Sequence, residues 1–465
     1  MSTAPALVDL GTPYRSCTSF ASEDGRSRSC EAPSIRFSPF IKGELRDQLP
    51  LAFAILNPKQ SDCAYPEKML CGSAVVFKLI QALALKLSTF NFQLATISPI
   101  PQGWEKWLLD MVGLATLSDM VSLTGENRVF AYYGLKVLRK SPRVGLSHLC
   151  SLLRMNRREL TEDDIGFMIT PRINAASRMG APMDAFRLFA TTDEAEAGVL
   201  AKHLNKINDE RKGLVASLVK EVRKIVHERH LERAPSVVVA GNPSWRPSLL
   251  GLVANSLAED FAKPVFVWGR EGSNLLKGSC RSGGSVDLSV LMQEARSVFL
   301  DFGGHREAGG FSVALEKVHL LEEELERAYE KVRTSGAGEA SGAIVDAKLS
   351  LDDISWDTWR QIEKLAPFGV GNPKPLFLFE NVEVRRVEQF GKDKNHLKLI
   401  FEKETGEKIS AIKFFAKPED FSPRGSTSWK EVEPRGKVNL LAHLERFTFR
   451  DFPELRLRIV DIIVT

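Results

Sequence analysis

A single amphipathic pattern near the middle of the chain constrains the fold more than any other feature of the sequence. It runs from about Thr191 to about His230, with apolar residues at helical spacing. The residues on this face are Leu200, Leu204, Ile207, Val215, Leu218, Val222 and Ile225. Such a helix spans roughly 50–60 Å, more than one globular core needs. The pattern therefore predicts a helix that connects two domains, and two ordinary helices broken at Gly213 are the alternative.

Residues before this helix predict a parallel α/β domain, because apolar strand-like and helical segments alternate. Leu51–Leu56 predicts a buried strand that ends in a turn at Asn57-Pro58. Gly72–Leu87 predicts a buried helix, and Trp104–Leu117 predicts a further helix or helix–strand piece. The apolar positions that define the first of these helices are Val75, Leu79 and Leu83. At the start of the long helix, Thr191 is the predicted N-cap of a capping box completed by Glu194.

Residues after the long helix predict a second α/β domain that ends near Val332. Pro235–Ala240 and Lys263–Trp268 have strand character, and Leu249–Phe261 between them has helical character. Ser335–Gly342 consists mostly of small residues and predicts a linker.

The C-terminal part of the chain predicts a small β-barrel. The expected strands are Leu376–Phe390, His396–Phe401, Lys408–Phe415, Val438–Phe447 and Glu454–Val464. Five strands within about 90 residues favour an OB-fold, a barrel that often binds single-stranded nucleic acid. The side chains that fit such binding are Lys392, Lys394, Lys398, Arg446, Arg450, Phe447 and Phe449. A solvated barrel surface over core phenylalanines is the alternative.

Composition narrows the function classes without identifying one. The 465 residues carry 63 basic and 59 acidic side chains, so any basic site must be local. Six cysteines include no Cys-x-x-Cys pair, which argues against a zinc knuckle, and no secretion signal accompanies them to favour disulfides. No apolar stretch is long enough for a membrane span. We therefore expect a cytoplasmic, non-membrane protein.

A glycine-rich segment, Phe302–Gly310, contains the first candidate site. Gly303 and Gly304 precede His305, so backbone N–H groups and an imidazole can approach a phosphate closely. A glycine-rich turn with an incidental histidine is the alternative.

Two other segments add arginines to this candidate site. Arg281 and Ser282 lie among small residues, and Arg172, Asn174 and Arg178 lie in one short segment. Planar guanidinium groups with several donors suit phosphate. Taken singly, each arginine is more often a salt-bridged surface residue.

Asp119 is the candidate metal ligand, because it follows an apolar run that resembles a strand. Ligands gather at the carboxyl ends of parallel strands, and carboxylates bind hard cations. A helix N-cap is the alternative reading of Asp119.

These segments, in this order and with the long helix between two α/β domains, resemble the RecJ single-stranded-DNA exonucleases of the DHH phosphoesterase superfamily. The resemblance runs from about Ile41 to the C-terminus. It implies a partial DHH domain, a connecting helix, a DHH-associated domain, a linker and an OB-fold domain. The corresponding ranges are 41–192, 193–232, 233–334, 335–350 and 351–465.

The resemblance also implies a two-metal Mn²⁺ or Mg²⁺ site, 5′→3′ hydrolysis and a role in DNA repair and recombination. It implies that Asp119 is a catalytic metal ligand and that His305 is catalytic. The implied substrate-binding residues are Arg172, Asn174, Arg178, Arg281, Ser282, Gly303 and Gly304. Ser177 stands where the family commonly has glycine, and Asn242–Arg246 stands where histidines usually flank the tryptophan.

The Asp-x-Asp and Asp-His-His motifs of this family have no counterpart in the chain. Arg36–Phe40 stands where the triplet is expected, and its side chains are poor ligands for a hard divalent cation. Residues 1–40 are rich in serine and lack helical or strand periodicity, which predicts either a disordered tail or a frame-shifted segment. Because one aspartate cannot hold two ions, we expect an impaired, front-truncated relative.

Two further hypotheses concern function. The chain could be a non-catalytic single-stranded nucleic-acid-binding protein, or a small-nucleotide phosphodiesterase of the DHH superfamily. The expected state is a monomer that binds single-stranded DNA, with a helicase and a single-strand-binding protein as candidate partners.

Overall fold

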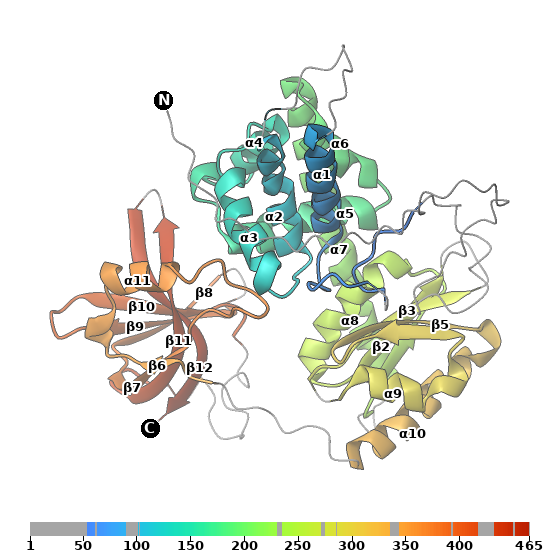
Figure 1. Ribbon diagram of the computed structural model, residues 1–465. Helices are drawn as coiled ribbons and strands as arrows, with labels where there is room; N and C mark the ends of the chain where they lie inside the picture. The colour runs from blue at the N-terminus through green and yellow to red at the C-terminus, as the bar shows by residue number, and fades with distance from the viewer. Residues whose placement is uncertain are drawn as a thin grey trace. The chain divides into compact units, whose positions relative to one another are not determined.

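The computed structural model describes residues 54–60, 63–89, 101, 103–229, 235–270, 275–284, 286–334, 344–391, 394–416, 432–449 and 452–464. Figure 1 shows the chain coloured from its N-terminus to its C-terminus, and its residues divide into two units. Unit 1 contains the residues up to Leu138 together with Leu365–Lys374, and unit 2 contains Arg139–Lys364 and Pro375–Thr465. Residues 1–40 and the predicted linker Ser335–Gly342 lie outside the described residues.

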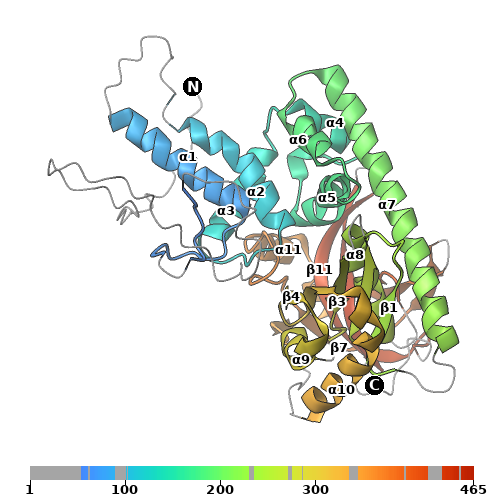
Figure 2. The same ribbon diagram turned by 90° about the vertical axis from the view of Figure 1, so that its right-hand side faces the viewer.

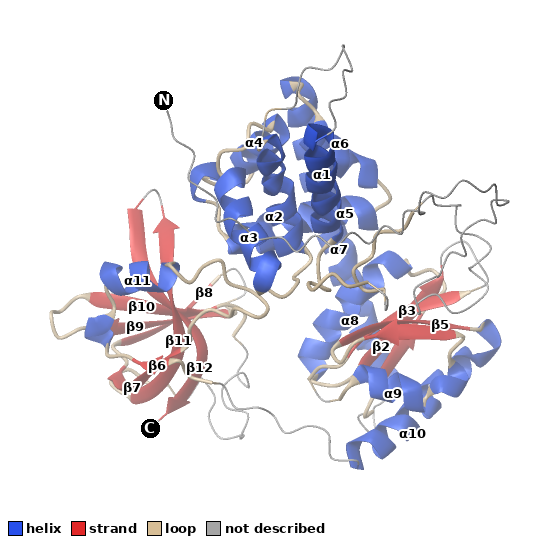
Figure 3. Cartoon of the chain, in the orientation of Figure 1, coloured by secondary structure: helices blue, strands red, loops and turns tan. Residues whose placement is uncertain are grey.

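The described elements of unit 1 are helices (Figure 3). They are α1 (Gly72–Thr89), η2 (Trp104–Leu108), α2 (Leu109–Ser118) and α3 (Gly125–Leu138). Helices α2 and α3 cross at two glycines. A Cβ atom on Gly113 would lie 2.5 Å from the Gly134 Cα, so the two backbones are in direct contact. Only glycine allows so close an approach.

The strand prediction for Leu51–Leu56 is wrong for its described part. Residues 54–56 are exposed coil, and the described residues of unit 1 include no strand that could pair with them. An apolar run alone does not distinguish a strand from coil. The predicted turn is present, since the Gln60 N–H donates to the Asn57 carbonyl at 3.1 Å.

Helix α1 confirms the predicted helix but not its predicted buried face. Leu79 and Leu83 are 42% and 51% exposed, whereas Ala74 and Phe77 are buried. The buried residues pack with Leu109, Val112 and Phe130 of the neighbouring helices. The sequence pattern identified an apolar helix, but the face that is covered depends on where α2 and α3 lie.

Unit 2 begins with further helices. They are α4 (Val144–Leu152), η3 (Arg157–Glu159), the π-helix η4 (Asp164–Ile169), α5 (Thr170–Arg178), α6 (Pro182–Ala190) and α7 (Glu194–Arg229). Helix α7 is continuous over 36 residues, so the predicted long helix is confirmed and a break at Gly213 is wrong. It contacts α4, α5 and α6 and continues past α8 (Figure 2). None of the helices that the structure describes is both long enough and apolar enough to cross a membrane.

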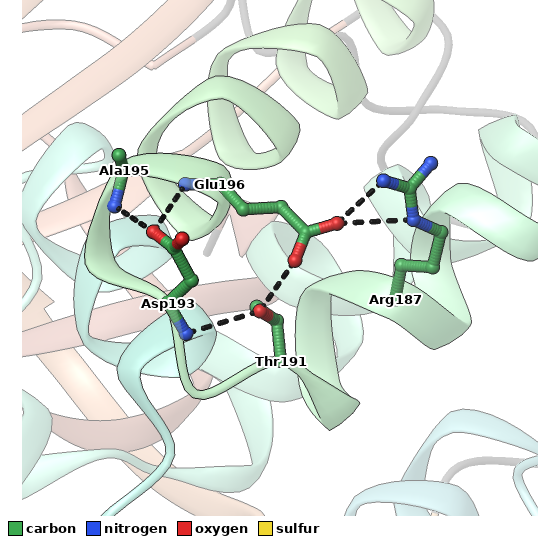
Figure 4. A network of polar contacts seen from close by, with 5 residues as sticks. All are labelled: Arg187, Thr191, Asp193, Ala195 and Glu196. Atoms are coloured by element: carbon green, nitrogen blue, oxygen red, sulfur yellow. Dashed lines mark hydrogen bonds and ion pairs between the residues drawn. The ribbon is translucent and has the colours of Figure 1, made fainter.

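The start of α7 differs from the predicted capping box. The Asp193 carboxylate caps the helix, accepting the N–H groups of Ala195 at 2.7 Å and Glu196 at 3.1 Å (Figure 4). The Thr191 hydroxyl accepts the Asp193 N–H at 3.1 Å and donates to the Glu196 carboxylate. The predicted Thr191–Glu194 pair is therefore wrong by two residues, because Asp193 is an equally good cap.

A five-stranded sheet follows, in the order β1-β2-β3-β5-β4. The strands are β1 (Val238–Gly241), β2 (Val265–Arg270), β3 (Leu276–Arg281), β4 (Asp301–Gly304) and β5 (Ala308–Val313). The helices on its two faces are α8 (Pro247–Phe261), α9 (Leu288–Glu294) and α10 (Leu321–Thr334). Val238 packs in the core with α7 and α8, whereas Val237 and Val239 pack in the core with α9 and α10. A strand buried on both faces explains the continuous apolar run. These elements confirm the predicted second α/β domain.

The C-terminal sheet has seven strands among the described residues, in the order β6-β7-β11-β12-β10-β9-β8, so the prediction of five strands is too low. The strands are β6 (Ala347–Lys348), β7 (Phe377–Glu383), β8 (Arg386–Phe390), β9 (His396–Glu402), β10 (Lys408–Lys413), β11 (Lys437–Phe449) and β12 (Phe452–Val464). Helix α11 (Trp356–Glu363) precedes β7. The predicted hairpin around Glu404–Glu407 is confirmed by antiparallel pairing of β9 with β10. The predicted strand Leu376–Phe390 is instead two strands.

Candidate functional site

Helix α5 in unit 2 positions three of the candidate residues. Arg172 is only 7% exposed, and its guanidinium donates to the Met168 carbonyl at 2.7 Å and to the Asn205 side chain at 3.1 Å. Burial lowers the pKa of Arg172, which the charge of Asp209 partly offsets. Asn174 is exposed and lies about 200° around the helix from Arg172, so these two side chains do not share a face.

Arg178 joins the end of α5 to the start of α8. Its guanidinium donates to the Ser248 carbonyl at 2.8 Å, and the Ser248 hydroxyl donates to the Arg178 carbonyl at 2.9 Å. This reciprocal pair fixes a half-buried arginine next to the sheet.

Arg281 and Ser282 lie at the end of β3. The Arg281 guanidinium donates to the Cys280 carbonyl at 2.7 Å, and burial lowers its pKa. Ser282 is 1% exposed, and its N–H donates to the Glu307 carbonyl at 3.2 Å. Its hydroxyl donates to the Glu307 carboxylate and accepts the Gly284 N–H at 3.0 Å. Ser282 therefore holds its loop against the loop that contains His305.

The loop between β4 and β5 places His305 across strand β5 from Arg281. The His305 N–H donates to the Ala308 carbonyl at 2.8 Å, and Ala308 is also the strand partner of Arg281. Gly303 and Gly304 are exposed, as is His305. A Cβ atom on Gly304 would lie 2.4 Å from the Ala308 oxygen, whereas nothing lies within 4 Å of a Cβ atom on Gly303. Gly304 is thus required for strand packing, and Gly303 is not.

Four arginines of unit 2, Arg172, Arg178, Arg211 and Arg281, form what we call the arginine cluster. The pKa of Arg211 is lowered by burial and by the charges of Arg178 and Arg172, and the charge of Arg178 also lowers the pKa of Arg281. Like charges that act on one another in this way are stabilised when an anion lies between them. Among the predicted residues, Arg178 therefore lies near Arg281, and Arg211 links Arg178 to Arg172.

The contribution of α7 was not anticipated from the sequence. Arg211 and Asn208 lie on the long helix, and Asn208 is completely buried. A polar pair three residues apart, adjacent to the buried Leu204 and Ile207, is the signal that could have identified them.

Asp119 lies in unit 1, at the C-terminal end of α2. Its N–H donates to the Ala115 carbonyl at 2.9 Å. The residue is exposed, but partial burial of the carboxyl group raises its pKa. The N-cap alternative is wrong, because Asp119 caps the C-terminus of α2. The run before it is the helix that the sequence also allowed, and the role of Asp119 as a metal ligand stays a prediction. Buried helices and strands have equally apolar sequences.

The segment Leu365–Lys374 packs against the loop that follows Asp119. The Leu123 N–H donates to the Val370 carbonyl at 2.6 Å, and the Arg128 guanidinium donates to the Leu365 carbonyl at 2.7 Å. Gly371 has a φ of +76°, and a Cβ atom there would lie 2.3 Å from the Ser122 hydroxyl.

A two-metal centre does not fit the residues that the structure describes. Among them, no three His, Cys, Asp or Glu side chains form a group that could hold a metal ion. Asp119 supplies one carboxylate, and a pair of divalent cations needs several oxygen or nitrogen ligands.

The predicted basic surface of the C-terminal sheet is only partly described. Lys392 and Arg450 lie outside the described residues, as does the side chain of Phe449. Lys394 is exposed, Lys398 is half-buried, and Arg446 pairs with Glu159 at 3.0 Å. The Arg456 guanidinium lies 3.9 Å from the centre of the Phe447 ring, a cation–π contact.

The chain matches two family models and several known proteins. Residues 234–333 match the DHHA1 domain, and residues 345–461 match the RecJ OB domain. The single-stranded-DNA-specific exonuclease RecJ of Bacillus subtilis is 32% identical over 361 residues, covering 77% of this chain and 43% of that protein. RecJ of Escherichia coli is 30% identical over 385 residues, covering 81% and 65%.

The fold has a counterpart among solved structures. The crystal structure of RecJ from Thermus thermophilus in complex with Mg²⁺ superposes with a TM-score of 0.66 at 24% identity. That match covers 86% of this chain and 57% of the RecJ chain. The chain thus spans between 43% and 65% of the length of these relatives.

Proposed function

This chain is a homologue of the RecJ single-stranded-DNA exonucleases, and we propose that it binds single-stranded DNA through Arg178 and Arg281 of the arginine cluster. The observation that carries the proposal is that both guanidinium groups lie against the start of α8, since Arg178 donates to the Ser248 carbonyl at 2.8 Å and the Arg281 Nη2 lies 3.4 Å from a Cβ position on Gly251. A phosphodiester backbone neutralises these charges, and guanidinium groups bind its oxygens with several donors. The exposed Gly303 and His305 lie across β5 from Arg281, about 10 Å away at the usual strand spacing, where a neighbouring phosphate of the same strand can approach.

Hydrolysis is a separate part of the proposal. The family activity is metal-dependent release of nucleotides from the 5′ end, and the relatives from Thermus thermophilus were solved with Mg²⁺ and with Mn²⁺. Because the chain contains no Asp-His-His triplet, we propose that DNA binding exceeds any hydrolysis by this polypeptide. Asp119 is the residue that would contribute a metal ligand. We also propose that the chain acts in DNA repair and recombination, in the cytoplasm.

Binding is tested by fluorescence anisotropy with a 5′-phosphorylated oligothymidylate in EDTA. The Arg281→Gln variant is expected to bind more weakly, with a dependence of log K on log salt that is shallower by about 0.7 for each phosphate that is no longer bound. Arg296→Gln is the matched control, because Arg296 is an exposed arginine of the same domain. Equal affinities for Arg281→Gln and Arg296→Gln would contradict the proposal.

Hydrolysis is tested with the same oligonucleotide in Mn²⁺. The proposal predicts bound but largely intact DNA. Robust nucleotide release that is lost in Asp119→Ala would show instead that the chain is a competent nuclease.

A small-nucleotide phosphodiesterase is the second candidate. It would favour a dinucleotide over a long strand, whereas a match to the RecJ OB domain over residues 345–461 favours the long strand. Measuring the affinities of the chain for a dinucleotide and for a long oligothymidylate separates these functions, and tighter binding of the dinucleotide would favour the phosphodiesterase. We also propose that the chain is a monomer and that a helicase and a single-strand-binding protein are its partners. Light scattering tests the first point, and pull-down measurements test the second.

A further inference from the structure

Two buried hydrogen-bond donors on α7 lack a partner. They are the Asn208 Nδ2 and the Arg211 Nε, and only two other buried side-chain polar atoms among the described residues share this state. An unpaired buried donor costs about 1–3 kcal/mol. Two such groups one helical turn apart therefore suggest a ligand that supplies acceptors.

The hydrogen bonds that these residues do make restrict the kind of ligand. The Arg211 Nη2 donates to the Asn208 Oδ1 at 3.0 Å, which uses the amide oxygen and leaves the amide NH₂ group unpaired. Both unpaired atoms are thus donors, so the missing partner is an acceptor. The charges of Arg172 and Arg178 act on the same guanidinium, which favours an acceptor with negative charge.

The nearest acid of α7 has other partners. The Asp209 carboxylate accepts the Asn205 amide at 3.3 Å, lies 3.8 Å from the Lys212 ammonium group and acts on the charge of Arg172. Asp209 is also well exposed, with 59% of its side chain accessible. It is not positioned as the partner of Arg211.

We propose that Asn208 and Arg211 form a phosphate subsite on α7, which binds a phosphodiester oxygen of the same strand that Arg281 contacts. The long helix is then part of the binding surface as well as a connection. This inference rests on the proposed function, and it adds a second contact from a different element. A buried water molecule is the competing occupant, since water also satisfies such donors.

The first test compares Arg211→Gln with Arg223→Gln in the full chain. Arg223 lies on the same helix but is exposed and paired with Asp260. We expect Arg211→Gln to weaken oligothymidylate binding about tenfold or more and to reduce the salt slope by about 0.7, with little change for Arg223→Gln. If Arg281→Gln weakens binding but Arg211→Gln behaves like Arg223→Gln, the subsite is wrong and the proposed function stands.

The second test uses Asn208→Leu, which removes the unpaired donor and also the oxygen that accepts the Arg211 Nη2 hydrogen bond. A lower melting temperature is therefore expected with either occupant. A phosphate subsite also predicts weaker DNA binding, whereas unchanged DNA affinity would support the buried water and overturn the subsite.

A wild-type chain that binds no DNA would refute the proposed function, and pyrophosphate then decides the subsite. A melting temperature raised by pyrophosphate in the wild type and in Arg281→Gln, but not in Arg211→Gln, would sustain an anion subsite. The absence of any pyrophosphate effect would overturn it.

Discussion

Replacing Gly304 with alanine should lower the stability of the five-stranded sheet of unit 2, whereas replacing Gly303 with alanine should not. A methyl group on Gly304 would lie 2.4 Å from the Ala308 oxygen and 2.5 Å from the Gly309 Cα, and both are backbone atoms of the paired strand. Strand β5 must therefore move by several tenths of an ångström. Overpacking of this kind costs about 1–3 kcal/mol.

Gly303→Ala is the matched control for this prediction. It adds the same methyl group one residue earlier in β4, where nothing lies within 4 Å. Reduced freedom of the unfolded chain should make it neutral or stabilising by about 0.4–1 kcal/mol.

Thermal unfolding followed by circular dichroism measures both variants. Each kcal/mol corresponds to about 2–4 °C for an unfolding unit of 150–250 residues. Gly304→Ala should therefore melt clearly below Gly303→Ala, and equal melting temperatures would refute the packing argument. If Gly303→Ala weakens DNA binding but has a normal melting temperature, glycine is needed at this position to let DNA approach and not for packing.

Three further predictions concern other parts of the chain. Asp193→Ala should destabilise the start of α7 by about 0.5–2 kcal/mol in urea unfolding, because Asp193 caps the helix. Gly113→Ala should lower the melting temperature of unit 1, because its methyl group would lie 2.5 Å from the Gly134 Cα. Burial raises the pKa of the Cys280 thiol from 9.0 to about 12, so the unfolded chain loses this proton first and stability should fall as pH rises from about 9 toward 12. Melting curves of Cys280→Ala over this pH range should decline less steeply.

Periodicity predicted the long helix well, because few other structures produce an apolar repeat that is sustained over 36 residues. The start of the helix was misplaced because Thr191 and Asp193 are both good caps, and only the observed hydrogen bonds to Ala195 and Glu196 distinguish them. Local signals fix the type of an element more reliably than its ends.

The candidate site was predictable only where its residues lie in short motifs. Arg281 and His305 stand among glycines and were identified on that basis. Arg211 stands in a polar stretch of a long helix, where arginine is usually exposed, and only its contact with Asn208 shows otherwise. The apolar run before Asp119 is equally suited to a helix and a strand. It forms helix α2, which packs against α1 and α3.

Because of the segment Leu365–Lys374, the C-terminal part of the chain cannot be exchanged as one independent domain. Although it lies between residues of unit 2, it belongs to unit 1 and bonds to Leu123 and Arg128. A gene fusion that exchanged all residues after Lys348 would also replace this segment. The loop after Asp119 would then lose the native partner of its hydrogen bonds. Exchange after Lys374 keeps these hydrogen bonds, so recombination between related chains should tolerate the later junction better.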